Sequence, residues 1–421
     1  MASLGHDVVG IDIDPEKVAA LTAGRAPFFE PGLDELLREQ LDRGTLQFST
    51  DIDDARGAAV HFVAVGTPQS AGSDAADLRF VDAAIEALLP ILSSGDLVVG
   101  KSTVPVGTAA RLRARLLAHG SGATLAWNPE FLREGFAVRD TVAPDRLVYG
   151  IERIADSHDP RAVMMLDEVY APIIAAQTPR IVTDFATAEL VKVAANAFLA
   201  TKISFINAMA EIAETVGADV TELADAIGHD ARIGRKFLNA GVGFGGGCLP
   251  KDIRAFTARA EELGRGESVA FLRQVDEINL RRRQRVVDLA TQAFGGSVVG
   301  RRIAVLGVTF KPDSDDVRDS PALDVAVMLR GLGAKVVATD PHGIANARRK
   351  HPQLKFAAST ADALRRAELV ILVTEWREYR ELDPVATAAL VADTAIIDGR
   401  NVLDPLAWRA AGWRYWGMGR P

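Results

Sequence analysis

The chain has 421 residues, which is enough for two or three domains that each bury their own core. Its composition, with 48% hydrophobic and 25% charged residues, is that of an ordinary globular protein. The formal net charge of −8 offers no basic surface for nucleic acid or for an anionic membrane, so a phosphate-bearing ligand has to meet a local cluster of cations.

Short β-branched runs alternate with amphipathic helical stretches, which is typical of βαβ units with parallel sheets. The strand-like runs are 8–12, 60–65, 96–99, 303–306, 336–340 and 369–373. Apolar residues recur at helical spacing over 184–216 and 267–294, which predicts two long helices. We therefore expect an α/β fold in which two Rossmann-like parallel-sheet domains, 1–183 and 297–421, are joined by a long-helix central domain, 184–296.

A weak internal repeat relates the two halves of the chain. Leu4-Gly5-x-x-Val8-Val9-x-x-Asp12 matches Leu332-Gly333-x-x-Val336-Val337-x-x-Asp340, and each copy predicts a helix end, a glycine cap, a strand and a terminal acid. The strand that should precede the first copy would fall before Met1. We therefore expect that the first strand and glycine loop of the N-terminal domain are missing because of a misplaced start, and that the chain as written binds a dinucleotide poorly. The alternative is a protein without a normal dinucleotide site.

Strand ends in the first half carry residues suited to a ligand at the carboxyl edge of a sheet. Asp12, with Lys17 nearby, stands where a Rossmann acid binds the adenosine ribose, although it could instead cap the following helix. Thr67 follows the run at 60–65, and Thr103 lies in Lys101-Ser102-Thr103-Val104-Pro105-Val106-Gly107. Each threonine could be a simple N-cap, but together they favour a bound ligand along this edge.

Two polar pairs at a spacing of four residues are candidates for chemistry. Glu130 and Glu134, in Asn128-Pro129-Glu130-Phe131-Leu132-Arg133-Glu134-Gly135, would share one face if a helix follows Pro129, or would merely complement the dipole of a helix start. Lys192 and Asn196 lie in an apolar, Ala-rich helix, where they are costly unless a partner is present. A developing oxyanion could be that partner, and a lysine that snorkels to the surface is the alternative.

The single cysteine lies in the most informative segment, Gly241-Val242-Gly243-Phe244-Gly245-Gly246-Gly247-Cys248-Leu249-Pro250-Lys251-Asp252. Pro250 predicts a helix start, which would place Cys248 near a helix N-terminus with Lys251 close by, and both features favour the thiolate. A buried structural cysteine is the usual alternative, but a Gly-rich loop suits it poorly. We therefore expect Cys248 to be a nucleophile.

The remaining composition predicts a cytoplasmic protein. No apolar run approaches the roughly 20 residues that cross a bilayer, and the N-terminus lacks a signal-peptide pattern. The seven histidines are too scattered to suggest a metal site. We expect no metal, no nucleic acid and no membrane among the partners.

The segments 232–252, 128–135, 188–207 and Thr309-Phe310-Lys311-Pro312 strongly resemble the UDP-glucose/GDP-mannose dehydrogenase family, and the likeness extends over essentially the whole chain. The resemblance implies an NAD-binding domain at 1–183, a central dimerisation domain at 184–296 and a UDP-sugar-binding domain at 297–421. It also implies the use of NAD for the four-electron oxidation of a nucleotide sugar through a cysteine thioester. A long central helix flanked by two α/β domains further suggests a homodimer. The run Arg232-Ile233-Gly234-x-Lys236-Phe237-Leu238 resembles the UDP-glucose branch more than the others, so UDP-glucose is the expected substrate.

Residue roles follow from the same resemblance. The catalytic set comprises Cys248 as nucleophile, Asp252 as the acid that assists proton transfer, Lys192 and Asn196 as the oxyanion pair, Glu130 in thioester hydrolysis, and Thr103 as a water-positioning residue. The cofactor would contact Asp12, Lys17, Thr67, Thr103, Glu134, Lys251 and Arg318. The sugar nucleotide would contact Phe131, Leu132, Arg133, Lys192, Asn196, Phe237, Gly245, Phe310, Lys311 and Arg400, with Arg232 supplied by a partner subunit.

Other functions remain open from the sequence. A GDP-mannose or UDP-N-acetylhexosamine dehydrogenase would share most of these residues. A two-electron hydroxy-acid dehydrogenase is disfavoured, because it has no need of a cysteine nucleophile. A nucleotide-sugar binding protein, inactive for lack of the glycine loop, is the non-enzymatic alternative.

Overall fold

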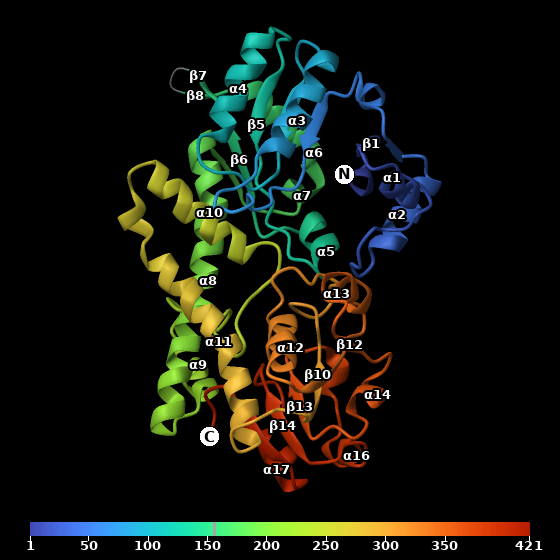
Figure 1. Ribbon diagram of the computed structural model, residues 1–421. Helices are drawn as coiled ribbons and strands as arrows, with labels where there is room; N and C mark the ends of the chain where they lie inside the picture. Colours follow the sequence, from blue (N-terminus) through green and yellow to red (C-terminus); the bar gives the residue numbers. More distant parts are fainter. Residues whose placement is uncertain (155–156) are drawn as a thin grey trace. The chain divides into compact units, whose positions relative to one another are not determined.

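The structure is a computed structural model that describes residues 1–154 and 157–421 (Figure 1). The chain forms two compact units. Unit 1 comprises Met1–Ala195 and Arg254–Gly266, and unit 2 comprises Asn196–Ile253 and Glu267–Pro421. Two helices, α8 (Phe185–Val216) and α10 (Leu249–Glu262), contribute residues to both units. The three domain boundaries expected from the sequence stay a prediction.

Unit 1 is built around a five-stranded sheet with the order β3-β4-β5-β6-β9, in which only the β5–β6 pairing is antiparallel. Its strands are β3 (Val60–Val63), β4 (Leu97–Gly100), β5 (Thr124–Trp127), β6 (Leu147–Ile151) and β9 (Arg180–Thr183). The helices of this unit are α1 (Pro15–Thr22), α2 (Leu33–Asp42), α3 (Arg79–Leu88), α4 (Thr108–His119), α5 (Ala137–Val142), α6 (Pro160–Val169) and α7 (Ala171–Ala175).

Both faces of this sheet are buried, which explains why its strands read as continuous apolar runs. Alternate residues of β4 point to opposite faces: Val98 packs with α3 and α4, whereas Leu97 and Val99 pack with α6 and α7. After β6, the short strands β7 (Arg153–Ile154) and β8 (Ser157–His158) pair antiparallel.

A separate two-stranded parallel sheet in unit 1 pairs β1 (Val8–Ile11) with β2 (Leu46–Ser49). Val9 and Ile11 of β1 pack against the core between the five-stranded sheet and α3 and α4. A 3₁₀ turn over Ala2–Leu4 ends at Gly5 in the left-handed conformation, as the repeat predicts. The expectation of a missing first strand stays a prediction.

Unit 2 is built around a six-stranded, fully parallel sheet with the order β12-β11-β10-β13-β14-β15. Its strands are β10 (Arg302–Leu306), β11 (Lys335–Thr339), β12 (Lys355–Phe356), β13 (Leu369–Leu372), β14 (Ala395–Asp398) and β15 (Arg414–Gly417). Ile303 and Val305 pack with α11 (Phe271–Ala293) and α12 (Pro321–Gly331), whereas Ala304 and Leu306 face an aromatic cluster on the other side.

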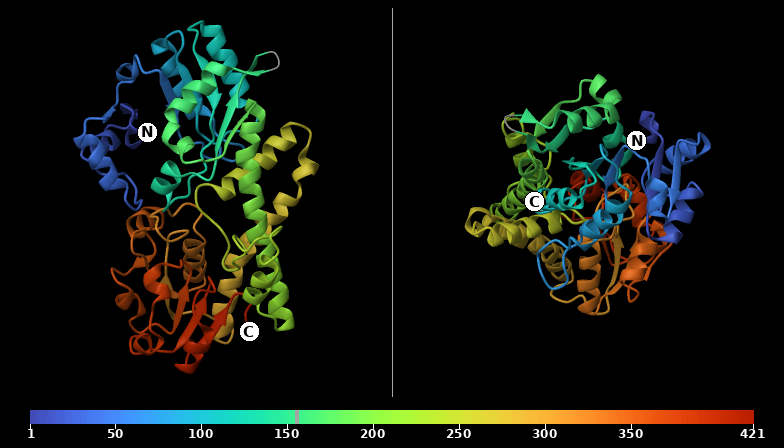
Figure 2. Two further views of the ribbon diagram at one scale, coloured as in Figure 1. Left: turned by 180° about the vertical axis from the view of Figure 1, so that it is seen from behind. Right: turned by 90° about the horizontal axis from the view of Figure 1, so that it is seen from above.

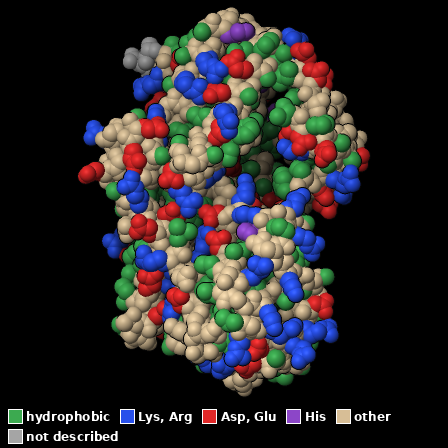
Figure 3. Space-filling view, viewed as in Figure 1, with side chains coloured by type: hydrophobic (Ala, Val, Ile, Leu, Met, Phe, Trp, Pro, Cys, Tyr) green, Lys and Arg blue, Asp and Glu red, His purple; other side chains and the backbone are tan. Residues whose placement is uncertain are grey.

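The part of α8 that belongs to unit 2, together with α9 (Val220–Gly228) and α11, lies beside this sheet (Figure 2). The smaller helices of unit 2 are α13 (Ile344–Lys350), α14 (Thr360–Leu364), α15 (Arg377–Arg380), α16 (Pro384–Ala388) and α17 (Pro405–Ala410). On the face seen in Figure 3, Lys and Arg side chains lie among Asp and Glu side chains.

Several helices begin with the same local signal, an Asp or Ser N-cap followed by Pro at the first helical position. In each case the cap side chain accepts a hydrogen bond from a backbone N–H of the first turn. The pairs are Asp14-Pro15, Asp159-Pro160, Ser320-Pro321, Asp383-Pro384 and Asp404-Pro405. These starts are therefore fixed locally by the sequence.

Helix α8 is long and apolar enough to cross a membrane by length and composition alone, and it is the one such helix among residues 1–154 and 157–421. Core helices of soluble proteins meet the same criterion. The expectation that no segment approaches a membrane span therefore has to be corrected, because it overlooked how apolar α8 is apart from a few polar side chains.

All six predicted strands and both predicted long helices are confirmed. The structure adds strands that the sequence reasoning missed, including β2, β5, β6, β14 and β15. β2 is the clearest case, since Leu46–Ser49 has a polar residue inside a run of only four residues and gains its pairing from β1.

Candidate active site

The end of β1 lies beside a pocket in unit 1. The pocket has a volume of about 340 Å³, within the range of small-molecule sites, and is lined by Asp12, Lys17, Leu21, Ala26, Pro27, Phe28, Leu33 and Leu37. Lys17 Nζ donates to Asp12 Oδ2 at 2.6 Å. Burial alone would raise the pKa of Asp12, but the hydrogen bonds from Lys17 and from the Asp14 backbone N–H hold it below its usual value. Helix α1 is capped by Asp14, so Asp12 is not the N-cap.

The two acids of the internal repeat are used differently. Asp340, at the end of β11, is buried and accepts hydrogen bonds from the backbone N–H groups of Val308, Thr309, His342 and Gly343 and from the Trp376 indole. Asp12 keeps 31% of its side chain exposed and has Lys17 as its side-chain partner. Only the first-half acid is therefore available to a ligand such as a ribose.

The strand ends after β3 and β4 are joined by side chains. The Thr67 hydroxyl donates to the Thr103 carbonyl at 2.8 Å, and the Ser102 hydroxyl donates to the Val65 carbonyl at 2.7 Å. Neither Thr67 nor Thr103 caps a helix, since α4 begins after Gly107. The Glu189 carboxylate of α8 holds the start of α4 by accepting from the Gly107 and Ala109 N–H groups at 2.8 and 2.7 Å. The two threonines thus lie at one edge of the sheet, as expected.

The segment 128–136 is a loop and not a helix. Glu130 and Glu134 therefore do not share a helix face, which the sequence allowed only if a helix follows Pro129. Helix α5 begins only at Ala137. Its start is held by the buried Glu30, which accepts from the Gly135 and Ala137 N–H groups at 2.7 Å each. Pro129 therefore does not start a helix, because Glu30 satisfies the N–H groups of Gly135 and Ala137, which lie six and eight residues after Pro129.

Lys192 contacts two residues of this loop, Glu130 and Phe131. Its Nζ is 3.3 Å from Glu130 Oε1 and 5.5 Å from the centre of the Phe131 ring, while Arg146 covers Phe131 at 3.9 Å. Lys192 is buried, so it does not snorkel to the surface. The partner that its burial requires is a carboxylate within unit 1.

A second lysine in this region, Lys101 at the end of β4, was not assigned a role from the sequence. Its Nζ donates to Asn128 Oδ1 at 3.1 Å and to the Tyr170 hydroxyl at 3.4 Å. Burial lowers the pKa of Lys101 to about 8, and the nearby charges of Glu130 and Lys192 also act on it. Its place in the Lys101–Gly107 motif was the available signal, but a strand-end lysine has no pattern that distinguishes it from a surface residue.

Cys248 immediately precedes α10 in unit 2, as predicted, and is exposed. Its carbonyl accepts the backbone N–H of Asp252 at 2.9 Å, which is the first turn of the helix. A thiol at a helix N-terminus is stabilised as the thiolate by the helix dipole. The exposed position excludes a buried structural cysteine.

Asp252 lies one turn after Cys248 and is almost fully buried. Asn196 Nδ2 of α8 donates to Asp252 Oδ2 at 2.6 Å, and Lys251 Nζ is 2.5 Å from Asp252 Oδ1. Both carboxylate oxygens are therefore engaged, which offsets the cost of burying the charge. The partner of Asn196 is thus Asp252.

The glycines before Cys248 permit close contacts with the loop between β10 and α12. A Cβ at Gly245 would lie 2.1 Å from the Asp319 carbonyl oxygen, and one at Gly246 would lie 2.7 Å from the Phe310 ring. A Cβ at Gly247 would meet the Arg318 guanidinium at 2.3 Å. Phe310 and Arg318 therefore lie against the Cys248 loop.

Arg400, at the end of β14, joins three segments of unit 2. Its guanidinium donates to the carbonyl oxygens of Val373, Gly243 and Phe310 at 2.7, 2.9 and 3.1 Å. The loop that carries it is held by the buried Asp398, which accepts from the Arg400, Val402 and Leu403 N–H groups. Lys311 Nζ lies 5.3 Å from the centre of the Phe310 ring. Arg400 and Lys311 thus converge on Phe310.

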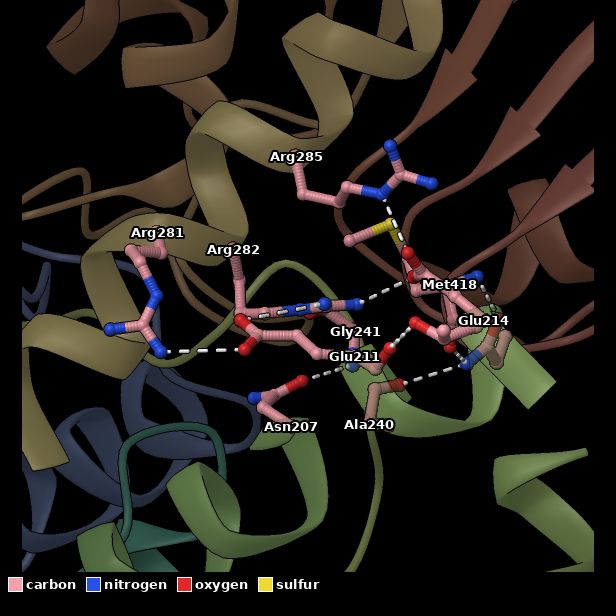
Figure 4. Close-up of polar contacts among 11 residues, drawn as sticks. Asn207, Glu211, Glu214, Ala240, Gly241, Arg281, Arg282, Arg285 and Met418 are labelled. Atoms are coloured by element: carbon pink, nitrogen blue, oxygen red, sulfur yellow. Dashed lines mark hydrogen bonds and ion pairs between the residues drawn. The ribbon is translucent and has the colours of Figure 1, made fainter. Parts of the chain in front are cut away.

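The first residue of the loop, Gly241, is held between α8 and α11 (Figure 4). Its N–H donates to Asn207 Oδ1 at 2.9 Å, and its carbonyl accepts from Arg282 Nε at 3.2 Å. Arg282 is fully buried, and its guanidinium lies 3.3 Å from Glu214 and 3.9 Å from Glu211. Sequence reasoning did not select Asn207, Arg282 or the nearby Asn279 and Arg283, although polar residues at core-facing positions of a helix were a usable signal.

Some predicted site residues are not grouped with the others within their unit. Arg133 forms a two-bond ion pair with Asp140, at 2.8 and 2.6 Å, and these hydrogen bonds lower the pKa of Asp140. Leu132 is exposed. Arg232 pairs with Asp230, and Phe237 has a positive φ of 66° on the same surface loop. Glu134 lies in the loop that precedes α5.

The fold is that of a Rossmann-type α/β protein, and its one cysteine is exposed between a Gly-rich loop and the start of a helix. Three family models match the chain. They are the NAD binding domain, the central domain and the UDP binding domain of the UDP-glucose/GDP-mannose dehydrogenase family, over residues 1–174, 186–281 and 304–405. The chain belongs to this family.

Individual relatives agree with this assignment. UDP-glucose 6-dehydrogenase of Rhizobium meliloti is 41% identical over 423 residues, covering 100% of this chain and 95% of the relative. UDP-glucose 6-dehydrogenase TuaD of Bacillus subtilis is 41% identical, covering 100% and 89%. The solved UDP-glucose dehydrogenase of Pyrobaculum islandicum has a TM-score of 0.88 and 38% identity, covering 100% and 94%. A UDP-D-ManNAc dehydrogenase of Pyrococcus horikoshii reaches a TM-score of 0.86 at 26% identity, covering 100% and 95%.

Proposed function

We propose that this protein oxidises the C6 alcohol of UDP-glucose to the carboxylate of UDP-glucuronate with two NAD⁺. The observation that carries the proposal is the exposed Cys248 at the start of α10, one turn from the buried Asp252. Support for the sugar comes from identity, which is 38–41% to proteins named UDP-glucose dehydrogenases and 26% to the UDP-D-ManNAc enzyme.

The cofactor side fits unit 1. Asp12 and Lys17 at the pocket would hold the adenosine ribose of NAD, with Thr67 and Thr103 along the same sheet edge. Glu134, Lys251 and Arg318 are the further contacts that the family resemblance proposes. When bound, NAD⁺ supplies the acceptor for each of the two hydrides.

The thiol explains how one protein performs two oxidations. The first removes a hydride from C6 and a proton from the hydroxyl, which leaves an aldehyde. Cys248 Sγ adds to the aldehyde carbon, and the resulting thiohemiacetal loses a second hydride and a proton to become a thioester. Water then adds to the thioester carbon, and the C–S bond breaks to release the carboxylate and the thiolate. The balance is two NAD⁺ and one water consumed, with two NADH and three protons released.

The remaining side chains have roles consistent with their contacts. Lys192 and Asn196 would stabilise the oxyanions that form at C6, and each is held by a carboxylate, Glu130 and Asp252 respectively. Asp252 would receive and return protons near the thiol, and Glu130, 27% exposed, would activate the hydrolytic water with Thr103. Phe310, Lys311, Arg400 and Gly245 in unit 2 would bind the sugar nucleotide, together with Phe131, Leu132, Arg133 and Phe237.

Replacing the nucleophile tests the proposal directly. Cys248→Ser should lower turnover by at least about a thousandfold, which corresponds to roughly 4 kcal/mol of barrier, because a hydroxyl at neutral pH lacks the reactivity of a thiolate. Substrate affinity should change little. The measurement is steady-state NADH production, with mass spectrometry of the variant for a covalent sugar-nucleotide adduct. Near-normal release of two NADH per substrate by this variant would remove Cys248 from the reaction.

Lys311 and Arg400 are both proposed to bind the diphosphate, but their different contacts within unit 2 predict different effects on stability. Lys311→Ala should raise KM for UDP-glucose much more than KM for NAD⁺, because a protein of net charge −8 offers a diphosphate little other attraction. Arg400→Ala should have the same effect and also lower the thermal unfolding midpoint, because it leaves three carbonyl groups without their donor. If both variants change the two KM values equally, the phosphate assignment is wrong.

We also propose that the protein is a cytoplasmic homodimer. Three large apolar residues, Phe198, Phe205 and Ile212, recur every seven residues along α8 and are 67%, 48% and 55% exposed. Such a row is typical of a helix that packs against a second copy, and Arg232, on an exposed loop, would reach the partner's substrate.

Sedimentation of the purified protein should give about twice the 45.0 kDa chain mass, and the protein should remain in the supernatant of a membrane-clearing spin. Phe205→Glu should shift it to the monomer, whereas Glu211→Gln on the same helix should not. A wild-type protein of 45.0 kDa at micromolar concentration would contradict the dimer.

A further inference from the structure

The Gly-rich loop 241–247 contains no regular secondary structure, and five of its seven residues are glycine. Glycine adds conformational freedom, so such a loop places a side chain accurately only if other groups fix its backbone. We propose that Asn279 and Arg283 of α11 are positioning residues for Cys248, because they clamp the loop backbone at Phe244 and join it to Asp319. The proposal rests on the proposed role of Cys248 as nucleophile.

Asn279 pairs with the loop as a strand would. The Phe244 N–H donates to Asn279 Oδ1 at 2.7 Å, and Asn279 Nδ2 donates to the Phe244 carbonyl at 3.0 Å. The approach is so close that a Cβ at Gly243, where φ is 95°, would lie 2.4 Å from Asn279 Oδ1. Asn279 thus satisfies both backbone groups of Phe244, four residues before Cys248.

Arg283 extends the clamp to the loop between β10 and α12, which lies on the other side of the Gly-rich loop and is called here the Asp319 wall. Its Nη2 donates to the Phe244 carbonyl at 3.2 Å, and its Nη1 donates to Asp319 Oδ1 at 2.7 Å and also to Asp324. The loop rests on that wall directly, since the Gly246 N–H donates to the Arg318 carbonyl at 2.9 Å. One guanidinium therefore fixes the distance between the Cys248 loop and the segment that carries Arg318.

Asn279 and Arg283 lie on the buried face of α11, where burying a polar side chain costs free energy. Leu272, Val275, Asn279, Arg283 and Val286 all face the interior, and Asn279 and Arg283 are 0% and 3% exposed. Apolar side chains at the same positions would avoid the cost of burying an amide and a guanidinium. Their hydrogen bonds go mainly to the loop and to the Asp319 wall, so accurate placement of the loop is what they add.

The reaction needs this accuracy at one atom. Sγ has to reach the aldehyde carbon and stay bonded to it, first in the thiohemiacetal and then in the thioester, while the sugar stays bound through other contacts. A displacement of about 1 Å from the productive geometry can lower a rate by on the order of a hundredfold. The clamp should therefore influence the chemical step more than the binding of either ligand.

Asn279→Ala in the full-length protein tests the clamp. We expect kcat to fall about a hundredfold, with KM for NAD⁺ within about twofold of wild type. The matched control is Ser204→Ala, which removes a buried hydrogen bond from α8 to the Val275 carbonyl of α11 at 2.7 Å without touching the loop. The control should lower the unfolding midpoint to a similar extent and leave kcat within about twofold.

A second readout separates position from reactivity. Cys248 is the only cysteine, so alkylation by iodoacetamide reports on it alone. We expect the alkylation rate of Asn279→Ala to stay within about threefold of wild type, because the thiol remains exposed at the start of α10. If Asn279→Ala does not fold, Arg283→Lys should show the same loss of kcat, since an ammonium cannot bridge Phe244 and Asp319 as a planar guanidinium does.

The clamp is refuted if kcat in a folded clamp variant stays within about threefold of wild type, if Ser204→Ala loses as much kcat, or if the alkylation rate falls as far as kcat. Failure of the proposed function gives a different result, because fully alkylated wild-type protein would then keep its activity. The two hypotheses are thus tested by separate measurements.

Discussion

One constraint shapes unit 2: the Gly-rich loop 241–247, which has almost no side chains, must lie directly against the backbone of other segments. Gly245 can approach the Asp319 carbonyl only because it has no Cβ, and the same absence leaves the loop without packing of its own. Rigidity is therefore supplied from outside, by Asn207 and Arg282 at Gly241, by Asn279 and Arg283 at Phe244, and by Arg400 at Gly243. Because the loop is held in this way, the exposed Cys248 thiol has a fixed position at the start of α10.

The two halves of the chain show how one βαβ pattern serves two purposes. In both, a glycine in the left-handed conformation precedes a parallel strand that ends in an acid. Asp340 accepts hydrogen bonds from backbone N–H groups and from the Trp376 indole, so it stabilises its own turn. Asp12 keeps part of its surface beside a pocket and can serve a ligand. The difference lies in the number of donors that surround each carboxylate, which the repeat in the sequence does not reveal.

Much of the fold could be predicted from the sequence because its elements carry local signals. Buried strands such as Ile303–Leu306 are continuous apolar runs, and Pro250 correctly indicated the helix start beside Cys248. The condition that a helix follows Pro129 is not met, because the acceptor that begins α5 is Glu30, about a hundred residues earlier in the chain. Lys101, Asn279 and Arg283 were missed for a related reason. Their partners are backbone groups or side chains distant in sequence, and no spacing rule reports such contacts.

In the proposed reaction, two successive oxidations pass through one thiol. Its most direct test is the yield of NADH from a limiting amount of UDP-glucose, with acid quenching during turnover and mass spectrometry of the peptide that contains Cys248. We predict two NADH for each UDP-glucose consumed, no accumulation of free aldehyde, and a fraction of the Cys248 peptide carrying the mass of the sugar-nucleotide thioester. One NADH for each UDP-glucose, with free aldehyde as the product and an unmodified Cys248 peptide, would contradict the account.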